Sequence, residues 1–247
     1  MNLDRYRRQI LLNEIGTNGQ ELLATKHAII IGGGGLGSNS ASLLVRMGIG
    51  TVDIVDFDVV ELTNLHRTAM FTEQDIGKPK ADVLQQKLKS VNTAVKVTAR
   101  NQKITSKNIA TVIKDADVVL DGTDSIQLRL LINDASLLHN IPWIYAGVSE
   151  TIGMVMGILP RITPCFQCIA QNIQDSKTKE LPILGTLPGI IAAIQCTEAM
   201  KILLGRKPKG LIIYDVWNQS FDTMDVKQNP KCPSCSKKNI NPKDEKP

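Results

Sequence analysis

The sequence predicts an α/β protein built on a Rossmann-like, doubly wound sheet that is mainly parallel. Short apolar runs alternate with helix-like stretches from residue 28 to residue 146, and this alternation is typical of a parallel sheet covered on both faces. A glycine-rich turn at 32–37 joins the first apolar run to the first long helical stretch. The last third of the chain predicts an antiparallel extension of the sheet, and two cysteine pairs indicate a structural zinc site.

The elements follow one another in a regular order. Residues 1–25 carry leucines and isoleucines at helical spacing interrupted by glycines, which predicts an arm of two short helices. The apolar runs predict strands at 28–31, 51–55, 95–99, 118–121 and 142–146. The stretches between them predict helices at 36–47, 80–91, 106–114 and 126–139.

The pattern changes after Gly147. A β-prone run covers 151–159, and the polar segment 171–180 has hardly any apolar residue, so it predicts either a loop over the active site, at about 170–188, or disorder. A helix at 189–204 and strands at 211–216 and 220–226 complete the predicted extension. Residues 26–235 are therefore expected to form a single domain, and 236–247 a flexible tail.

Composition excludes several classes of protein. The 247 residues are 43% hydrophobic, but no uninterrupted apolar run has the roughly 18 residues that a membrane helix needs. The net charge of +5 comes partly from the lysine-rich end at 227–246, and only three tyrosines and two tryptophans are interspersed along the chain. We therefore expect a soluble, cytoplasmic protein that binds neither membranes nor nucleic acid.

Four of the five cysteines form two close pairs, Cys165 with Cys168 and Cys232 with Cys235. Two Cys-x-x-Cys pairs in a cytosolic chain predict four thiolates around a tetrahedral zinc ion, and a redox pair or unrelated surface thiols are the alternatives. Such a site has no open position, so its role is structural. Cys196 stands alone in a helical pattern and is expected to be a small core residue.

The glycine turn predicts a nucleotide site. It follows a strand and opens a helix, so its N–H groups can approach a phosphate at the positive end of the helix dipole. The next predicted strand ends at Asp56, whose carboxylate is placed to accept hydrogen bonds from ribose hydroxyls. These features alone suit NAD, flavin or ATP.

The polar residues that follow favour a triphosphate. Asp56, Asn64, Lys80 and Asp124 come just after predicted strands, so an open parallel sheet would bring them to one crevice. With Arg67, they supply a ribose acceptor, phosphate donors of both the arginine and lysine type, and an acid suited to magnesium. Each residue alone has an ordinary structural explanation, such as a helix cap or a solvated acid.

At this point the sequence resembles the ubiquitin-activating-enzyme-like adenylyltransferases of the ThiF, MoeB and HesA type. The resemblance covers almost the whole chain. Its matching motifs are Arg5-Tyr6-Arg7-Arg8-Gln9-Ile10, Gly32-x-Gly34-Gly35-x-Gly37, Asp56-Phe57-Asp58, Asn64-Leu65-x-Arg67, Gly77-x-Pro79-Lys80, Asp121-x-Thr123-Asp124 and both cysteine pairs.

The resemblance implies an ATP- and magnesium-dependent enzyme. Its substrate would be the C-terminal glycine carboxylate of a small ubiquitin-like sulfur carrier with a Gly-Gly end, which is converted to an acyl-adenylate. A homodimer, a structural zinc, a sulfur-donor protein and a role in thiamine or molybdopterin synthesis are implied as well.

The resemblance also assigns roles to residues. The nucleotide would be bound by Gly32, Gly34, Gly35, Gly37, Asp56, Asp58, Asn64, Arg67, Lys80 and Asp124. Among these, Asp56 is expected to contact the ribose, and Asn64 and Arg67 the phosphates. Lys80 would stabilise charge at the α-phosphorus, Asp124 would hold magnesium, and Arg8 would reach across a dimer interface to the partner's ATP.

One motif departs from the family pattern. Many relatives carry a cysteine shortly before the last long helix, whereas residues 180–185 here contain none, which predicts an enzyme that stops at the adenylate. Adenylation of a peptide or small-molecule carboxylate is a second hypothesis. A nicotinamide-dependent oxidoreductase and a catalytically silent scaffold are two others, both disfavoured by the intact set of charged residues.

Overall fold

The computed structural model describes residues 2–170 and 182–236, which include an eight-stranded sheet with the order β3-β2-β1-β4-β5-β6-β7-β8. Strands β1 to β5 are parallel, and β6, β7 and β8 each run antiparallel to the neighbour before them. The predicted mainly parallel sheet with an antiparallel extension is therefore confirmed. The strands are β1 (His27–Ile31), β2 (Thr51–Val55), β3 (Lys96–Arg100), β4 (Val118–Asp121), β5 (Trp143–Ser149), β6 (Ile152–Ile158), β7 (Leu211–Asp215) and β8 (Ser220–Met224).

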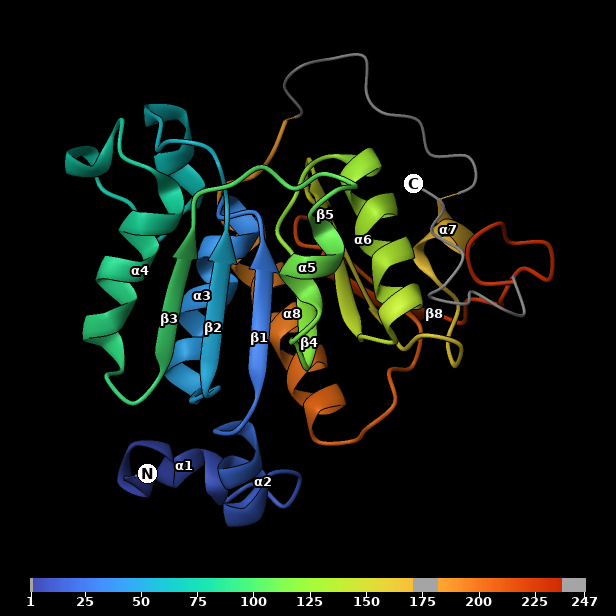
Figure 1. Ribbon diagram of the computed structural model, residues 1–247, viewed down its shortest axis with the longest axis horizontal. Coiled ribbons are helices and arrows are strands. Elements are labelled where there is room, and N and C mark those ends of the chain that lie inside the picture. The colour runs from blue at the N-terminus through green and yellow to red at the C-terminus, as the bar shows by residue number, and fades with distance from the viewer. Residues whose placement is uncertain (1, 171–181, 237–247) are drawn as a thin grey trace.

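Helices cover both faces of the sheet, as Figure 1 shows. The α-helices are α1 (Arg7–Ile10), α2 (Gly16–Leu23), α3 (Gly35–Met47), α4 (Lys80–Val91), α5 (Ile109–Ile113), α6 (Ile126–His139), α7 (Phe166–Ile169) and α8 (Leu187–Leu203). Short 3₁₀ helices are η1 (Leu3–Tyr6), η2 (Leu62–Arg67) and η3 (Glu73–Asp75). Helices α3, α4 and α8 lie on one face, and α5 and α6 lie on the other. No helix in the described part of the chain is long and apolar enough to cross a bilayer.

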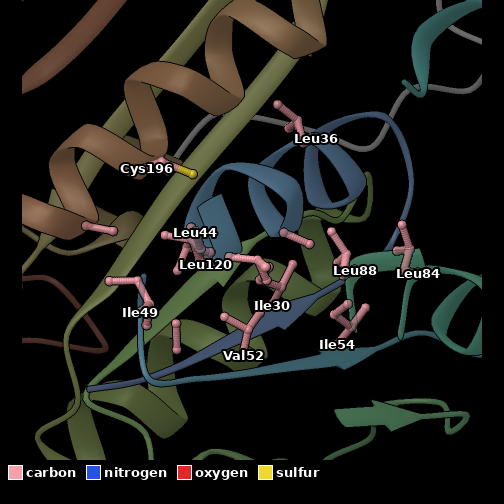
Figure 2. Packing of buried hydrophobic residues seen from close by; sticks show 14 of the residues in the cluster. Ile30, Leu36, Leu44, Ile49, Val52, Ile54, Leu84, Leu88, Leu120 and Cys196 are labelled. Atoms are coloured by element: carbon pink, nitrogen blue, oxygen red, sulfur yellow. The ribbon is translucent and has the colours of Figure 1, made fainter. Parts of the chain in front are cut away.

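Alternation along the strands builds two cores, because successive side chains of a strand point to opposite faces. Ile30 of β1 packs with α3, α4 and α8, whereas its neighbours Ile29 and Ile31 pack with α5 and α6. Figure 2 shows the first core, in which Ile30, Val52, Ile54 and Leu120 of the strands meet Leu36, Leu44, Leu84, Leu88 and Cys196 of the helices. Each fully buried side chain of this size contributes about 1.5–3 kcal/mol.

The N-terminal arm lies at the amino ends of the parallel strands (Figure 1). The Tyr6 hydroxyl accepts a hydrogen bond from Asn92 Nδ2 at 2.7 Å, just after α4 ends. The Tyr6 ring also packs against Gly48, whose φ of 83° ends α3 in a left-handed turn. Gln9 Nε2 donates to the Met47 carbonyl at 3.2 Å. The arm is thus fixed to the ends of α3 and α4 that are farthest from the carboxyl edge of the sheet.

A charged cluster sits on the β1–β3 part of the sheet. The buried Asp53 carboxylate pairs with Arg100 and lies 3.3 Å from His27 Nε2. The nearby Asp53 carboxylate raises the pKa of His27 above its usual value. Burial acts to raise the pKa of Asp53, but His27 and Arg100 outweigh it and hold that pKa below its usual value. The contacts within this cluster therefore favour the charged forms of His27 and Asp53.

Several boundaries differ from the sequence prediction for physical reasons. Helix α5 begins at Ile109 rather than 106, because Asn108 Oδ1 accepts from the Thr105 N–H at 2.8 Å and forms a turn there. Helix α8 begins before residue 189 and includes Pro188 in its first turn, where proline is tolerated. Strand β5 extends to Ser149 because β6 pairs with it as far as Ile152. Helix α7 and the 3₁₀ helices η2 and η3 were not predicted, and 171–181 and 237–247 lie outside the described residues.

Candidate nucleotide site and cysteine cluster

The glycine turn joins the carboxyl end of β1 to the start of α3. Gly32 has a φ of 94°, and a Cβ added there would lie 2.5 Å from the Gly122 carbonyl oxygen. A Cβ on Gly37 would lie 1.7 Å from the Gly32 oxygen, and one on Gly122 would lie 2.3 Å from it. Only glycine fits at these three positions, so the turns after β1 and β4 and the first turn of α3 are in direct backbone contact.

Asp56 follows β2 and is tied to the glycine turn. Its Oδ2 accepts from the Gly33 N–H at 2.5 Å and its Oδ1 from the Asp58 N–H at 2.7 Å. The residue is 7% exposed, so both bonds form in a shielded place. This geometry fixes an acid beside the helix N-terminus where the nucleotide fingerprint requires one.

Lys80 is the first residue of α4 and lies next to the segment after β2. Its N–H donates to the Asp58 carbonyl at 2.9 Å, and its Nζ lies 3.3 Å from Asp58 Oδ2. A cation in the first turn of a helix is opposed by the helix dipole. Lys80 pairs with Asp58 instead, and this pair lies at the carboxyl edge of the sheet, where an open α/β fold binds its ligands.

Helix η2 places Asn64 and Arg67 beside the glycine turn. Asn64 is buried, and its Oδ1 accepts from the Glu61 N–H at 3.1 Å, which caps η2. Asn39 Nδ2 donates to the Gly35 carbonyl at 2.7 Å and to the Arg67 carbonyl at 3.3 Å. A Cβ on Gly35 would lie 3.4 Å from Arg67 Cγ and Cδ, so the Arg67 side chain runs along the turn. Its Nη1 donates to the Thr63 carbonyl at 2.6 Å.

The turn after β4 carries Asp124. Strand β4 pairs with β1, so that Asp121 is opposite Ile31, the residue before the glycine turn. Asp121 is fully buried, and Arg129 Nε donates to its Oδ2 at 2.8 Å. Sequence reasoning missed Arg129. The sequence signal that could have revealed it is Asp121 at the end of a central apolar strand, because a buried acid needs a cation to pair with.

The structure brings the predicted nucleotide residues together, with the exception of Arg8. The four glycines, Asp56, Asp58, Asn64, Arg67, Lys80 and Asp124 all lie in the glycine turn or in segments that follow the carboxyl ends of β2 and β4. Arg8 lies in α1, at the amino ends of the strands (Figure 1). Within one subunit, Arg8 is therefore not part of the site.

The two cysteine pairs meet in space. The Sγ–Sγ distances are 3.9 Å for Cys165–Cys168, 3.6 Å for Cys165–Cys232 and 3.5 Å for Cys168–Cys235, and all four sulfurs lie within 4.8 Å of one another. Four sulfurs around a shared tetrahedral zinc lie about 3.8 Å apart. The spacing therefore fits a four-coordinate metal.

The surroundings of the cluster suit thiolate ligands. Gln228 Nε2 donates to Cys235 Sγ at 3.4 Å, a contact that stabilises negative charge on sulfur. Burial, followed by the neighbouring sulfurs, raises the pKa of Cys165 far above its usual value when no cation is present. A bound cation would supply the missing compensation.

Cys196 is a core residue, as predicted. It faces α3 from α8 (Figure 2), and its Sγ donates to the Ser40 carbonyl at 3.5 Å. Burial raises its pKa to about 12. A thiol that stays protonated and is enclosed by apolar side chains is not a nucleophile.

The fold and the site define a nucleotide-binding α/β protein whose charged residues suit a triphosphate. Residues 6–234 match the model of the ThiF family, and the chain belongs to that family. It is 35% identical to the sulfur carrier protein adenylyltransferase of Thermus thermophilus over 94% of this chain and 90% of that protein. It is also 35% identical to the sulfur carrier protein ThiS adenylyltransferase of Escherichia coli over 96% of this chain and 97% of the relative.

Solved structures show the same architecture. The Escherichia coli MccB structure with ATP superposes with a TM-score of 0.84 at 25% identity, covering 95% of this chain and 75% of that chain. Because the relatives are adenylyltransferases along nearly the whole chain, this protein is an enzyme of that type. Membership of this family also removes the nicotinamide-dependent oxidoreductase as an alternative.

Proposed function

We propose that this enzyme uses ATP and magnesium to adenylate the C-terminal glycine carboxylate of a ubiquitin-like sulfur carrier, with release of pyrophosphate. The observation that carries this proposal is the gathering of Asp56, Arg67, Lys80 and Asp124 around the glycine turn at one edge of the sheet. The substrate class follows from the names of the relatives, which act on sulfur carrier proteins.

In this mechanism the protein positions groups and stabilises charge. Asp56 binds the ribose, and the glycine turn and Arg67 hold the phosphates. The carrier carboxylate attacks the α-phosphorus in line with the leaving pyrophosphate, and Lys80 stabilises the charge that develops there. Lys80 first exchanges its contact with Asp58 for the phosphate. Asp124 would hold magnesium, which neutralises phosphate charge when bound.

Arg8 acts only in a dimer. It lies at the amino edge of its own sheet, whereas the nucleotide residues lie at the carboxyl edge. A homodimer in which the arm of one subunit reaches the crevice of the other would bring an arginine to the triphosphate. The arm would then supply a second phosphate donor alongside Arg67.

The four-cysteine cluster holds zinc in a structural role. The sulfur spacing leaves no fifth position for a substrate, and the cluster joins the segment after β6 to the segment after β8. Cysteine pairs that bind zinc rather than form disulfides are typical of a reducing compartment, which supports a cytoplasmic enzyme.

The reaction ends at the adenylate. Residues 180–185 contain no cysteine, and Cys196 is sealed in the core. A separate sulfur-donor protein would therefore convert the adenylate to a thiocarboxylate, in a thiamine or molybdopterin pathway.

ATP–pyrophosphate exchange tests the proposal. With a Gly-Gly-ended carrier present, the wild type should exchange label, and Lys80→Ala and Asp124→Ala should each lower the rate by on the order of a hundredfold or more. Lys87→Ala is the matched control, because it removes another lysine of α4 that also pairs with an acid, Asp75. Wild-type exchange in the Lys80 and Asp124 variants would overturn the assignment.

The carrier itself is tested by offering other acceptors. A peptide carboxylate is the second candidate substrate, and the solved MccB structure with ATP shows that this fold binds the nucleotide that either reaction needs. Exchange that requires a Gly-Gly-ended protein supports the carrier hypothesis. Exchange that proceeds only with short peptides or small acids would favour the alternative, and no exchange with any acceptor would favour a silent scaffold.

A further inference from the structure

A buried arginine underlies the turn that carries Asp124. Arg129, in the first turn of α6, donates from Nε to Asp121 Oδ2 at 2.8 Å. Its Nη2 donates to the Thr123 carbonyl at 2.6 Å and to the Ala146 carbonyl at 3.1 Å. One guanidinium therefore joins the end of β4, the turn after it, and β5.

The residues on both sides of Asp124 are fixed by this arrangement. The N–H and Oγ1 of Thr123 both donate to Asp121 Oδ1 at 2.8 Å, and its carbonyl accepts from Arg129. Ser125 Oγ accepts from the Leu128 N–H at 3.3 Å and caps α6. Since every polar atom of Thr123 is bonded and Ser125 is a helix cap, the backbone of Asp124 has little freedom.

Stability alone does not explain an ion pair in this place. A buried ion pair often contributes no more than well-packed apolar residues of the same volume. Asp121 is fully buried and the Arg129 side chain is 12% exposed. An apolar pair would fill the same volume but would leave the Thr123 and Ala146 carbonyls without this donor. What the guanidinium adds is a planar set of donors that reaches three acceptors at once.

We propose that Arg129 is a positioning residue that, through Thr123, holds Asp124 where its carboxylate meets the magnesium that accompanies ATP. This inference rests on the proposed function, because the role of Asp124 does. Lysine is a poor replacement for Arg129, because its single nitrogen cannot reproduce the two separate donor positions, Nε and Nη2, from which the three bonds are made.

The test uses Arg129→Lys, which keeps the charge and removes the fork. The readouts are binding of Mn²⁺ in the presence of a non-hydrolysable ATP analogue, followed by the spectroscopic signal of free Mn²⁺, and the Mg²⁺ concentration that gives half-maximal exchange. We expect Mn²⁺ affinity to fall, and the Mg²⁺ requirement to rise, by about tenfold or more. Binding of the analogue in the presence of a chelator should not change.

Arg100→Lys is the matched control. Arg100 also pairs with a buried aspartate, Asp53, on the β1–β3 surface of the sheet. Its carbonyl accepts from the Asp56 N–H at 3.2 Å, a main-chain contact that Arg100→Lys keeps. This variant should retain the wild-type metal dependence. A metal dependence of Arg129→Lys that equals that of the wild type would overturn the inference.

The double variant Asp121→Asn, Arg129→Gln separates positioning from stability. It removes both charges, so that no uncompensated buried charge remains. If the double variant melts at a higher temperature than Arg129→Lys, close to the wild type, while its Mg²⁺ requirement stays raised, Arg129 is a positioning residue. Wild-type values of both the melting temperature and the Mg²⁺ requirement would show a purely structural role and refute the inference.

The outcome for the wild type separates this inference from the proposed function. If the wild type exchanges label and binds Mn²⁺, and Arg129→Lys binds Mn²⁺ equally well, only this inference is refuted. If the wild type binds no nucleotide, the proposed function is refuted as well.

Discussion

Variants of Arg8 and Lys80 are expected to complement each other in a mixed dimer. Arg8→Ala and Lys80→Ala homodimers should each lack exchange activity, because every crevice in them lacks one cation. A dimer with one subunit of each kind should regain one complete crevice. In it, Lys80 comes from the Arg8→Ala subunit and Arg8 from its partner.

The geometry of α4 sets the expected result. Tyr6 is bonded to Asn92 just beyond one end of α4, and Lys80 is the first residue at the other end. The 12 residues of the helix make it about 18 Å long, which is much more than an arginine side chain spans. Arg8 therefore cannot serve the Lys80 of its own subunit. Each mixed dimer has one complete crevice of two, so a sample that contains only mixed dimers should regain about half of the wild-type activity.

The assay is ATP–pyrophosphate exchange on subunits carrying two different tags, co-expressed and purified through both. The control mixes Lys80→Ala with Asp124→Ala, whose mixed dimers have no complete crevice because both residues belong to the same subunit's site. Activity in that control, or none in the Arg8 and Lys80 mixture, would refute the reasoning. Wild-type activity of Arg8→Ala alone would show that the arm contributes nothing to the reaction.

Three further predictions concern the cysteines and the charged sheet surface. Cys168→Ser should lose the bound metal and lower the melting temperature, and metal analysis that finds no zinc in the wild type would contradict this. Cys196, with its pKa raised to about 12, should resist alkylation in the folded enzyme at pH 8, and Cys196→Ala should retain exchange; rapid labelling would disprove its burial. The pKa of His27 lies above its unfolded value of 6.5, so its contribution to stability is complete below that pH and is lost as the pH rises through the folded pKa. His27→Gln should flatten this loss of stability with rising pH, measured as the melting temperature at several pH values. An unchanged loss would show that His27 does not cause it. The pKa of Asp53 lies below 3.8, so its own contribution disappears only as the pH falls through the folded pKa.

The sequence was sufficient for features that depend on local pattern. The order of strands and helices from β1 to β5 followed from apolar runs and the glycine turn, and the two Cys-x-x-Cys pairs were correctly expected to meet. Asp56 and Lys80 were placed at the carboxyl edge because parallel strands share that edge.

What the sequence did not reveal depends on contacts between distant segments. Arg129 looks like an ordinary helix residue until β4 and β5 bring Asp121 and Ala146 to it. Helix η2 carries no periodic apolar pattern, because it is held by the Glu61–Asn64 cap rather than by a buried face. The position of Arg8 at the opposite edge of the sheet required the Tyr6–Asn92 contact, which joins residues far apart in the chain.

The contact among Gly32, Gly37 and Gly122 has a consequence for how this sequence can change. In most cores, a larger side chain at one position can be accommodated by a smaller one opposite. No residue is smaller than glycine, so an added carbon at any of the three has no compensating substitution at the other two. Substitutions at these three positions are therefore excluded as a set, because the turn after β1, the turn after β4 and the first turn of α3 meet through their backbones alone.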